Sequence, residues 1–259
     1  MTNTALTQHR SYAMATRNPA ITRANFSRVE VAEDGAVMTL GGTMRKTFIL
    51  LAIMSAGMLY VWEGMPGIGL SPGVVYGLFI VGFVVGVGLL LYTTANPQMA
   101  RATGPVYAAI QGLVLGALTL VLSQNPKYKG LPIAAAALTV ATLAVMFVAY
   151  RTGAIKVTER LKTIVVSCTL AIFAFYIIAF VAQLFGVYIP MLHEGGVIGI
   201  GFSIFVVALA AFNLLLDFDF IEHNVGQAPE VIEWYAAFAL VVTLIWLYTE
   251  ILRLLRKVR

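Results

Sequence analysis

The side chains best suited to chemistry in this chain are carboxylates in a stretch that carries no lysine and no arginine. Residues 163–252 contain no Lys and no Arg, although the whole chain has a formal net charge of +5. The stretch is mostly apolar and holds seven of the twelve acids: Glu194, Asp217, Asp219, Glu222, Glu230, Glu233 and Glu250. A carboxylate in or beside hydrocarbon is costly and is usually kept for a purpose. Acids without basic neighbours indicate a site that handles a cation, a proton or both.

The densest polar group lies at the end of one apolar run. If a helix continues to His223, Asn213 and Asp217 share a face, and Asp219 lies on a neighbouring face. A hard cation such as Ca²⁺ takes its ligands from carboxylate, amide and water oxygens. We therefore predict a cation or proton site formed by Asn213, Asp217 and Asp219, with the two aspartates as Ca²⁺ ligands. The alternative is an interfacial helix end whose acids face water.

The same carboxylates are suited to sensing pH. Proximity of two carboxylates, or the loss of water around one, favours the protonated form. A carboxyl group that gains a proton loses affinity for a cation. Ca²⁺, as a permeant or regulatory ion, is the one bound species that we expect, and no other cofactor is indicated.

Glu250 is a further candidate for the cation site, near the far end of the last apolar run. Arg253 follows one helical turn later, so an interfacial ion pair is the alternative. Glu250 lies roughly 25–29 Å along its helix from the loop that adjoins Asp217. The residues level with Asp217 are instead expected near 238–243.

The composition predicts an all-α membrane protein that positions these acids within seven transmembrane helices. The chain is 60% hydrophobic with a mean hydropathy of +0.88, and only 11% of its residues are charged, against about 25% in soluble domains. We expect residues 1–46 to be a disordered polar tail and residues 47–259 to form the transmembrane domain. Seven apolar runs have about the length of a membrane span: 47–62, 73–93, 104–123, 131–150, 162–183, 196–217 and 231–252.

The distribution of Lys and Arg predicts the orientation. With the N-terminus inside, the inside segments hold eleven basic residues and the outside segments six, and basic residues favour the cytoplasmic side. Seven spans place the basic C-terminus outside, which disagrees with that rule, so the side of the C-terminus stays open. The basic residues need no nucleic-acid partner. Lipid, Ca²⁺ and protons are the expected partners.

The sequence does not indicate an enzyme. Ser203 lies in the sixth run, but His193 and His223 lie outside the runs, so a serine–histidine site within the membrane is not formed. A Gly-x-Gly-Asp sequence, a nucleotide-binding loop and a zinc signature are all missing from the sequence.

Three sequence features resemble the Bax inhibitor-1 family, also called transmembrane Bax inhibitor motif proteins. They are the seven-span plan, the Leu-Leu-Asp sequence that ends at Asp217, and the last run with Trp-Leu-Tyr-Thr-Glu-Ile-Leu-Arg at 246–253. The segment Arg-Asn-Pro-Ala at 17–20 is similar to the tail of a bacterial subgroup that includes YccA-like proteins. The resemblance implies a last helix surrounded by the other six, and the plasma (inner) membrane of a bacterium with a cytoplasmic N-terminus.

The resemblance also implies a site of two acids, one in each of the last two spans. Asp217 matches the first, with Leu216 in place of a tyrosine. Matching the letters places the second at Glu250, whereas matching helix length places it at residue 242 or 243, in which case Asp219 is the substitute. The resemblance further implies an arginine after the second span that pairs with Asp217, and Arg101 is the candidate.

Two functions are consistent with these features. The first is a pH-sensitive leak channel for Ca²⁺ or another cation, with its carboxylate site at the end of the sixth span. The second is a non-conducting regulator that binds another membrane protein, such as a quality-control protease, through the arginine-rich tail.

Overall fold

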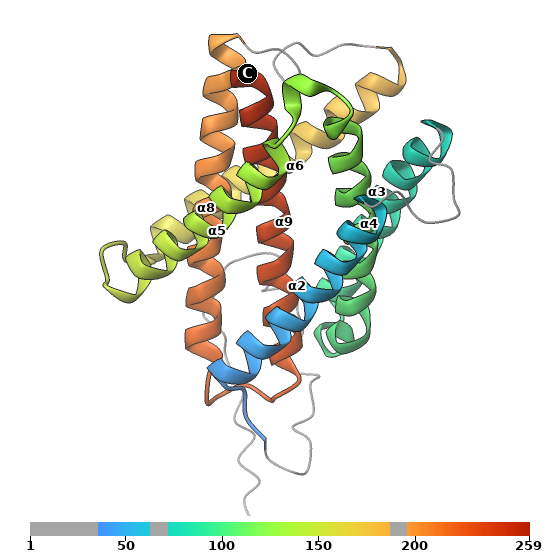
Figure 1. Cartoon of the computed structure of the whole chain (residues 1–259). Helices are drawn as coiled ribbons and strands as arrows, with labels where there is room; N and C mark the ends of the chain where they lie inside the picture. Colours follow the sequence, from blue (N-terminus) through green and yellow to red (C-terminus); the bar gives the residue numbers. More distant parts are fainter. Residues whose placement is uncertain (1–35, 63–71, 187–195) are drawn as a thin grey trace, which may run out of the picture.

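The computed structural model describes residues 36–62, 72–186 and 196–259, and these residues fold into a bundle of long helices (Figure 1). Seven of the helices are long and apolar enough to cross a membrane. They are α2 (Leu40–Trp62), α3 (Pro72–Ala95), α4 (Ala100–Ser123), α5 (Leu131–Arg151), α6 (Glu159–Leu184), α8 (Val197–Asn224) and α9 (Ile232–Val258). Short 3-10 turns, η2 (Pro97–Met99) and η3 (Pro126–Tyr128), precede α4 and α5. The predicted all-α fold with seven spans is confirmed.

Several helices extend beyond the predicted apolar runs, and the added turns carry charged residues. The first helix begins at Leu40 rather than at residue 47, so Lys46 lies inside it. Residues 1–35 of the predicted tail lie outside the described residues. The helix α8 continues to Asn224, which places Asp217 about two turns before its end. These charged turns hold most of the polar contacts described below.

The last helix, α9, is the centre of the bundle. It packs along α2, α4, α5 and α8, and 56% of its most apolar stretch is buried, against 18% for α3 and 17% for α6. It also contacts the two outer helices: Tyr176 of α6 bonds to Glu250, and Thr94 of α3 contacts Tyr235. Figure 1 shows α8 and α9 side by side and antiparallel, with α2 crossing them. The prediction that the last helix is surrounded by the other six is confirmed.

Glycines allow α2 and α4 to approach each other closely. A Cβ atom on Gly112 or Gly116 of α4 would collide with the backbone carbonyls of Met54 and Met58 in α2. Small residues four apart are a common device for close helix packing in membranes. Gly112 and Gly116, four residues apart on α4, therefore serve the close packing of α4 against α2.

The bundle has two ends, which we call proximal and distal. The proximal end contains the start of α2, the α5–α6 connection and the α8–α9 connection. The distal end contains the α4–α5 connection and the end of α9, where the C-terminus lies in Figure 1. Among the described residues, the ion pairs of Lys46 and Lys162 lie at the proximal end, and the ion pair of Arg253 lies toward the distal end.

Candidate functional site

The two aspartates of α8 face different helices. The Asp219 carboxylate forms an ion pair of 2.8 Å with Lys162 at the start of α6, and His223 Nδ1 lies 3.4 Å from its other oxygen. Asp217 has no ion pair within the described part of the chain, and it lies beside Thr243 of α9. Residues two apart on a helix point in nearly opposite directions. The structure therefore does not bring Asp217 and Asp219 together as ligands of one ion.

Asp217 is held in an unusual environment for a carboxylate. Its Oδ2 atom is buried and has no hydrogen-bond partner among the described residues. Thr243 supplies the adjoining hydroxyl, which itself donates to the carbonyl of Ala239 at 3.2 Å. Tyr235 of α9 also faces the carboxylate. The predicted position of residues 238–243 at the level of Asp217 is confirmed by the contact with Thr243.

The other predicted members of the site lie elsewhere. The Asn213 amide donates to Thr169 of α6 at 2.8 Å and to the carbonyl of Leu209 at 2.9 Å. Arg101 is exposed at the start of α4 and forms no ion pair with Asp217 in the described structure. The basic residue that pairs with an acid of α8 is instead Lys162, and its partner is Asp219.

Glu250 belongs to a separate buried cluster nearer the distal end. It is 1% exposed, both of its carboxylate oxygens lie 2.9 Å from Nη1 of Arg253, and it accepts a hydrogen bond of 2.9 Å from Tyr176. The Arg253 guanidinium also lies over the Tyr176 ring, 4.8 Å from its centre. The ion pair with Arg253, which the sequence offered as the alternative for Glu250, is confirmed. The role of Tyr176 was missed because α6 is distant in sequence.

The Tyr176 hydroxyl is expected to stabilise this cluster. Tyr176→Phe removes a donor to the buried Glu250, so we expect the free energy of unfolding to fall by about 1–3 kcal/mol. Thermal denaturation in detergent, followed by circular dichroism, measures the change. The matched control is Tyr92→Phe, because Tyr92 is exposed on α3. Equal stability of the two variants would contradict a role for the hydroxyl.

A third cluster ties the N-terminal segment to the α8–α9 connection. Lys46 forms ion pairs with Glu233 and, at 3.0 Å, with Glu230, and Thr39 donates its N–H and its hydroxyl to Glu233 at 2.7 and 2.8 Å. Backbone hydrogen bonds join Met38 to Ala228 and Gly226, each at 2.8 Å. Lys46 and Glu233 are 5% and 2% exposed. This cluster was not predicted from the sequence. The sequence signal for it was the presence of Lys46 and Glu233, two charged residues in the first two turns of apolar helices.

Asp217 is therefore the exception among the described acids of residues 163–252. Asp219, Glu230, Glu233 and Glu250 are paired with Lys162, Lys46 or Arg253, and Glu222 accepts a hydrogen bond from Tyr150. All the basic partners come from outside the stretch that lacks Lys and Arg: Lys162 and Arg253 flank it directly, and Lys46 lies in α2. Glu194 lies outside the described residues. The Asp217 carboxylate has no basic partner among these described residues, and its Oδ2 atom accepts no hydrogen bond there.

Unsatisfied buried polar atoms also lie along α9. In the described residues they are Oδ2 of Asp217, Oγ1 of Thr119 in α4 and the hydroxyl of Tyr248 in α9, and the last two adjoin each other. The described residues contain no group of three or more His, Cys, Asp or Glu side chains arranged to hold a metal ion. A cation at Asp217 would need hydroxyl, carbonyl or water oxygens for its other ligands.

The fold and this site define a polytopic α-helical membrane protein built around its last helix. The sequence model of the family described as Bax inhibitor 1 like matches residues 18–259. The chain belongs to that family, so the resemblance seen in its motifs is confirmed. No curated protein and no solved structure matches the chain.

Proposed function

We propose that the protein is a pH-sensitive leak channel for Ca²⁺ or a similar cation, with Asp217 as the group that binds the ion. The observation that carries the proposal is the carboxylate of Asp217, which faces the central helix without a basic partner in the described structure. A buried charge is normally paired or neutralised. A cation or a proton supplies that neutralisation here. The proposal assigns no catalytic step.

The polar side chains along α9 support a path for the ion. Tyr235 and Thr243 adjoin Asp217, and Tyr248 adjoins Thr119 toward the distal end. From Tyr235 to Tyr248 the helix rises about 20 Å, a large part of the hydrocarbon thickness of about 30 Å. Buried polar groups of this kind are commonly satisfied by ordered water. A hydrated cation moving along α9 would meet oxygen atoms at several levels.

Competition between a proton and a cation at Asp217 supports the pH sensitivity. The titratable group that faces the carboxylate is Tyr235, and no Lys, Arg or His forms an ion pair with it among the described residues. The neutral carboxyl group is a poorer cation ligand than the carboxylate. We therefore expect cation flux to fall as the pH is lowered through the titration of Asp217.

The proposed orientation places the proximal end in the cytoplasm, beneath the plasma membrane of a bacterium. The count of Lys and Arg supports this assignment. Asp217 then lies about 10 Å of helix from the cytoplasmic end of α8. An ion that leaves the cytoplasm would meet this carboxylate early in its path.

The test is Ca²⁺ entry into proteoliposomes that contain a fluorescent Ca²⁺ indicator. Asp217→Asn is expected to lower the rate at least tenfold and to abolish its pH dependence, because the amide cannot be ionised. A tenfold change corresponds to about 1.4 kcal/mol of lost ion stabilisation. The matched control is Glu222→Gln, because Glu222 is exposed and lies on the same helix. Its flux should stay near that of the unaltered protein.

Equal flux in Asp217→Asn and in the unaltered protein would overturn the channel proposal. The non-conducting regulator would then be the better candidate. A pull-down of membrane proteins with and without residues 1–35 tests that function directly, since it does not depend on flux.

A further inference from the structure

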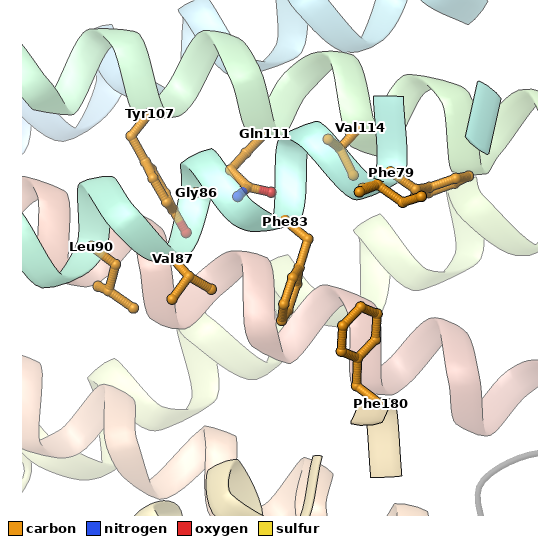
Figure 2. Close-up of a pocket in the computed structure, with 10 residues that line it drawn as sticks. Phe79, Phe83, Gly86, Val87, Leu90, Tyr107, Gln111, Val114 and Phe180 are labelled. Atoms are coloured by element: carbon orange, nitrogen blue, oxygen red, sulfur yellow. The ribbon is translucent and has the colours of Figure 1, made fainter. Parts of the chain in front are cut away.

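A pocket of about 350 Å³ opens on the side of the bundle between α3, α4 and α6, away from Asp217 (Figure 2). Its walls are almost wholly apolar, and the rings of Phe83 in α3 and Phe180 in α6 meet at one side with centres 5.2 Å apart. Ile80 and Phe83 at its edge are 58% and 45% exposed. Because these exposed side chains belong to membrane-spanning helices, the pocket opens toward lipid.

Two polar side chains of α4 enter this apolar pocket. Tyr107 and Gln111 are four residues apart and therefore lie on one face of the helix, and both line the pocket. Figure 2 shows them extending from α4 toward α3. Gly86 of α3 makes room for them, because a Cβ atom there would collide with the Gln111 amide and would lie 3.9 Å from the Tyr107 ring.

Neither polar group has a hydrogen-bond partner within the described protein. The Tyr107 hydroxyl and the Gln111 amide form no side-chain hydrogen bond there, whereas the hydroxyls of Thr103 and Ser123 on the same helix donate to the carbonyls of Met99 and Thr119. An unpaired polar group in hydrocarbon costs several kcal/mol. A ligand oxygen placed between the two donors would remove that cost.

The depth of the pocket identifies the kind of ligand. Gln111 lies eleven residues after Ala100 and twelve before Ser123, so it is about 17 Å of helix from either end of α4. That is near the middle of a hydrocarbon core about 30 Å thick. The ester and phosphate oxygens of phospholipids lie at the membrane surface and do not reach this level. A plain acyl chain reaches it but offers no acceptor.

We propose that this pocket binds a neutral, lipid-soluble quinone or similar cyclic ketone. Its carbonyl oxygen would accept hydrogen bonds from Tyr107 and Gln111, and its flat ring would pack against Phe79, Phe83 and Phe180. Apolar walls with a few placed polar groups are typical of small-molecule sites. The site is separate from Asp217 and does not depend on the channel proposal.

The experiment measures binding of decylubiquinone to the full chain in lipid nanodiscs by equilibrium dialysis. Tyr107→Phe and Gln111→Leu are each expected to weaken binding about tenfold, because each removes one hydrogen bond in a site without water. Val87→Phe is expected to abolish binding by filling the pocket. Thermal denaturation of each variant establishes that it is folded.

The matched controls make the same two kinds of substitution at positions outside the pocket. Gln183→Leu and Tyr92→Phe alter exposed side chains of α6 and α3, and both should bind decylubiquinone as the unaltered protein does. Decylbenzene, which has the ring and chain but no carbonyl, should bind at least tenfold more weakly than decylubiquinone. Equal binding of the two probes, or undiminished binding in folded Tyr107→Phe and Gln111→Leu, would overturn the proposal and indicate a groove for plain acyl chains.

Discussion

Replacing Lys46 by methionine is expected to lower the free energy of unfolding by about 3–5 kcal/mol, because it leaves a buried carboxylate without its cation. Glu233 is 2% exposed, and the Thr39 N–H and hydroxyl are the remaining donors to it. Denaturation of the purified protein in mixed detergent micelles measures the loss. Methionine keeps most of the length of the lysine chain, so little of the effect arises from lost packing.

The double variant Lys46→Met with Glu233→Leu separates the charge from the packing. Removing both members of a buried ion pair is often neutral, whereas removing one is costly. We therefore expect the double variant to be more stable than Lys46→Met alone. Additive losses in the double-mutant cycle would show that the two side chains act independently.

Gly41 and Gly42 provide a second control on the cluster that contains Lys46 and Glu233. A Cβ atom on Gly42 would collide with the Glu233 carboxylate, whereas one on Gly41 would meet nothing within 4 Å. Alanine is favoured over glycine inside a helix by about 1 kcal/mol. Gly41→Ala should therefore be neutral or slightly stabilising, and Gly42→Ala should destabilise.

Replacing both Gly112 and Gly116 by alanine is expected to cost about 2–6 kcal/mol, from about 1–3 kcal/mol for each overpacked position. The new methyl groups would meet the backbone of α2 at Met54 and Met58. Backbone atoms cannot turn aside as the end of a side chain can, so the two helices must separate. Separation would loosen the packing of both α2 and α4 against α9.

The same denaturation assay measures this change. The matched control is Gly77→Ala with Gly88→Ala, because a Cβ atom at either position of α3 meets nothing within 4 Å. That control should be neutral or slightly stabilising, since alanine is the better helix former. Similar losses in the two double variants would show that glycine in these spans matters for flexibility rather than for close approach.

The number and order of helices could be predicted because hydrocarbon imposes a length and an apolar composition on every span. The position of Thr243 beside Asp217 could also be predicted, because helix rise is constant and the loop between the two helices is short. Glu250 could be separated from Asp217 by the same arithmetic. These predictions depend only on the length of each helix, its rise per residue and the length of the connecting loop.

The partners of the charged residues could not be predicted in the same way. Lys162 pairs with Asp219 across the consecutive spans α6 and α8, and Lys46 pairs with Glu233 across the first and last spans. Lys46 also lay in a segment whose polar composition resembled a tail. Which helix faces which depends on packing around α9, and apolar spans of similar composition do not specify that arrangement.

The pairing of Lys46 with Glu233 has a consequence for biosynthesis. The two residues are 187 positions apart in the chain, so at about 5–20 residues per second a ribosome needs roughly 10–40 s to make the second after the first. Until Glu233 is made, Lys46 lacks the carboxylate that it pairs with in the folded bundle. Glu233 belongs to α9, the final helix, which packs at the centre of the bundle. The ion pair between the first and last spans can therefore form only when synthesis is nearly finished.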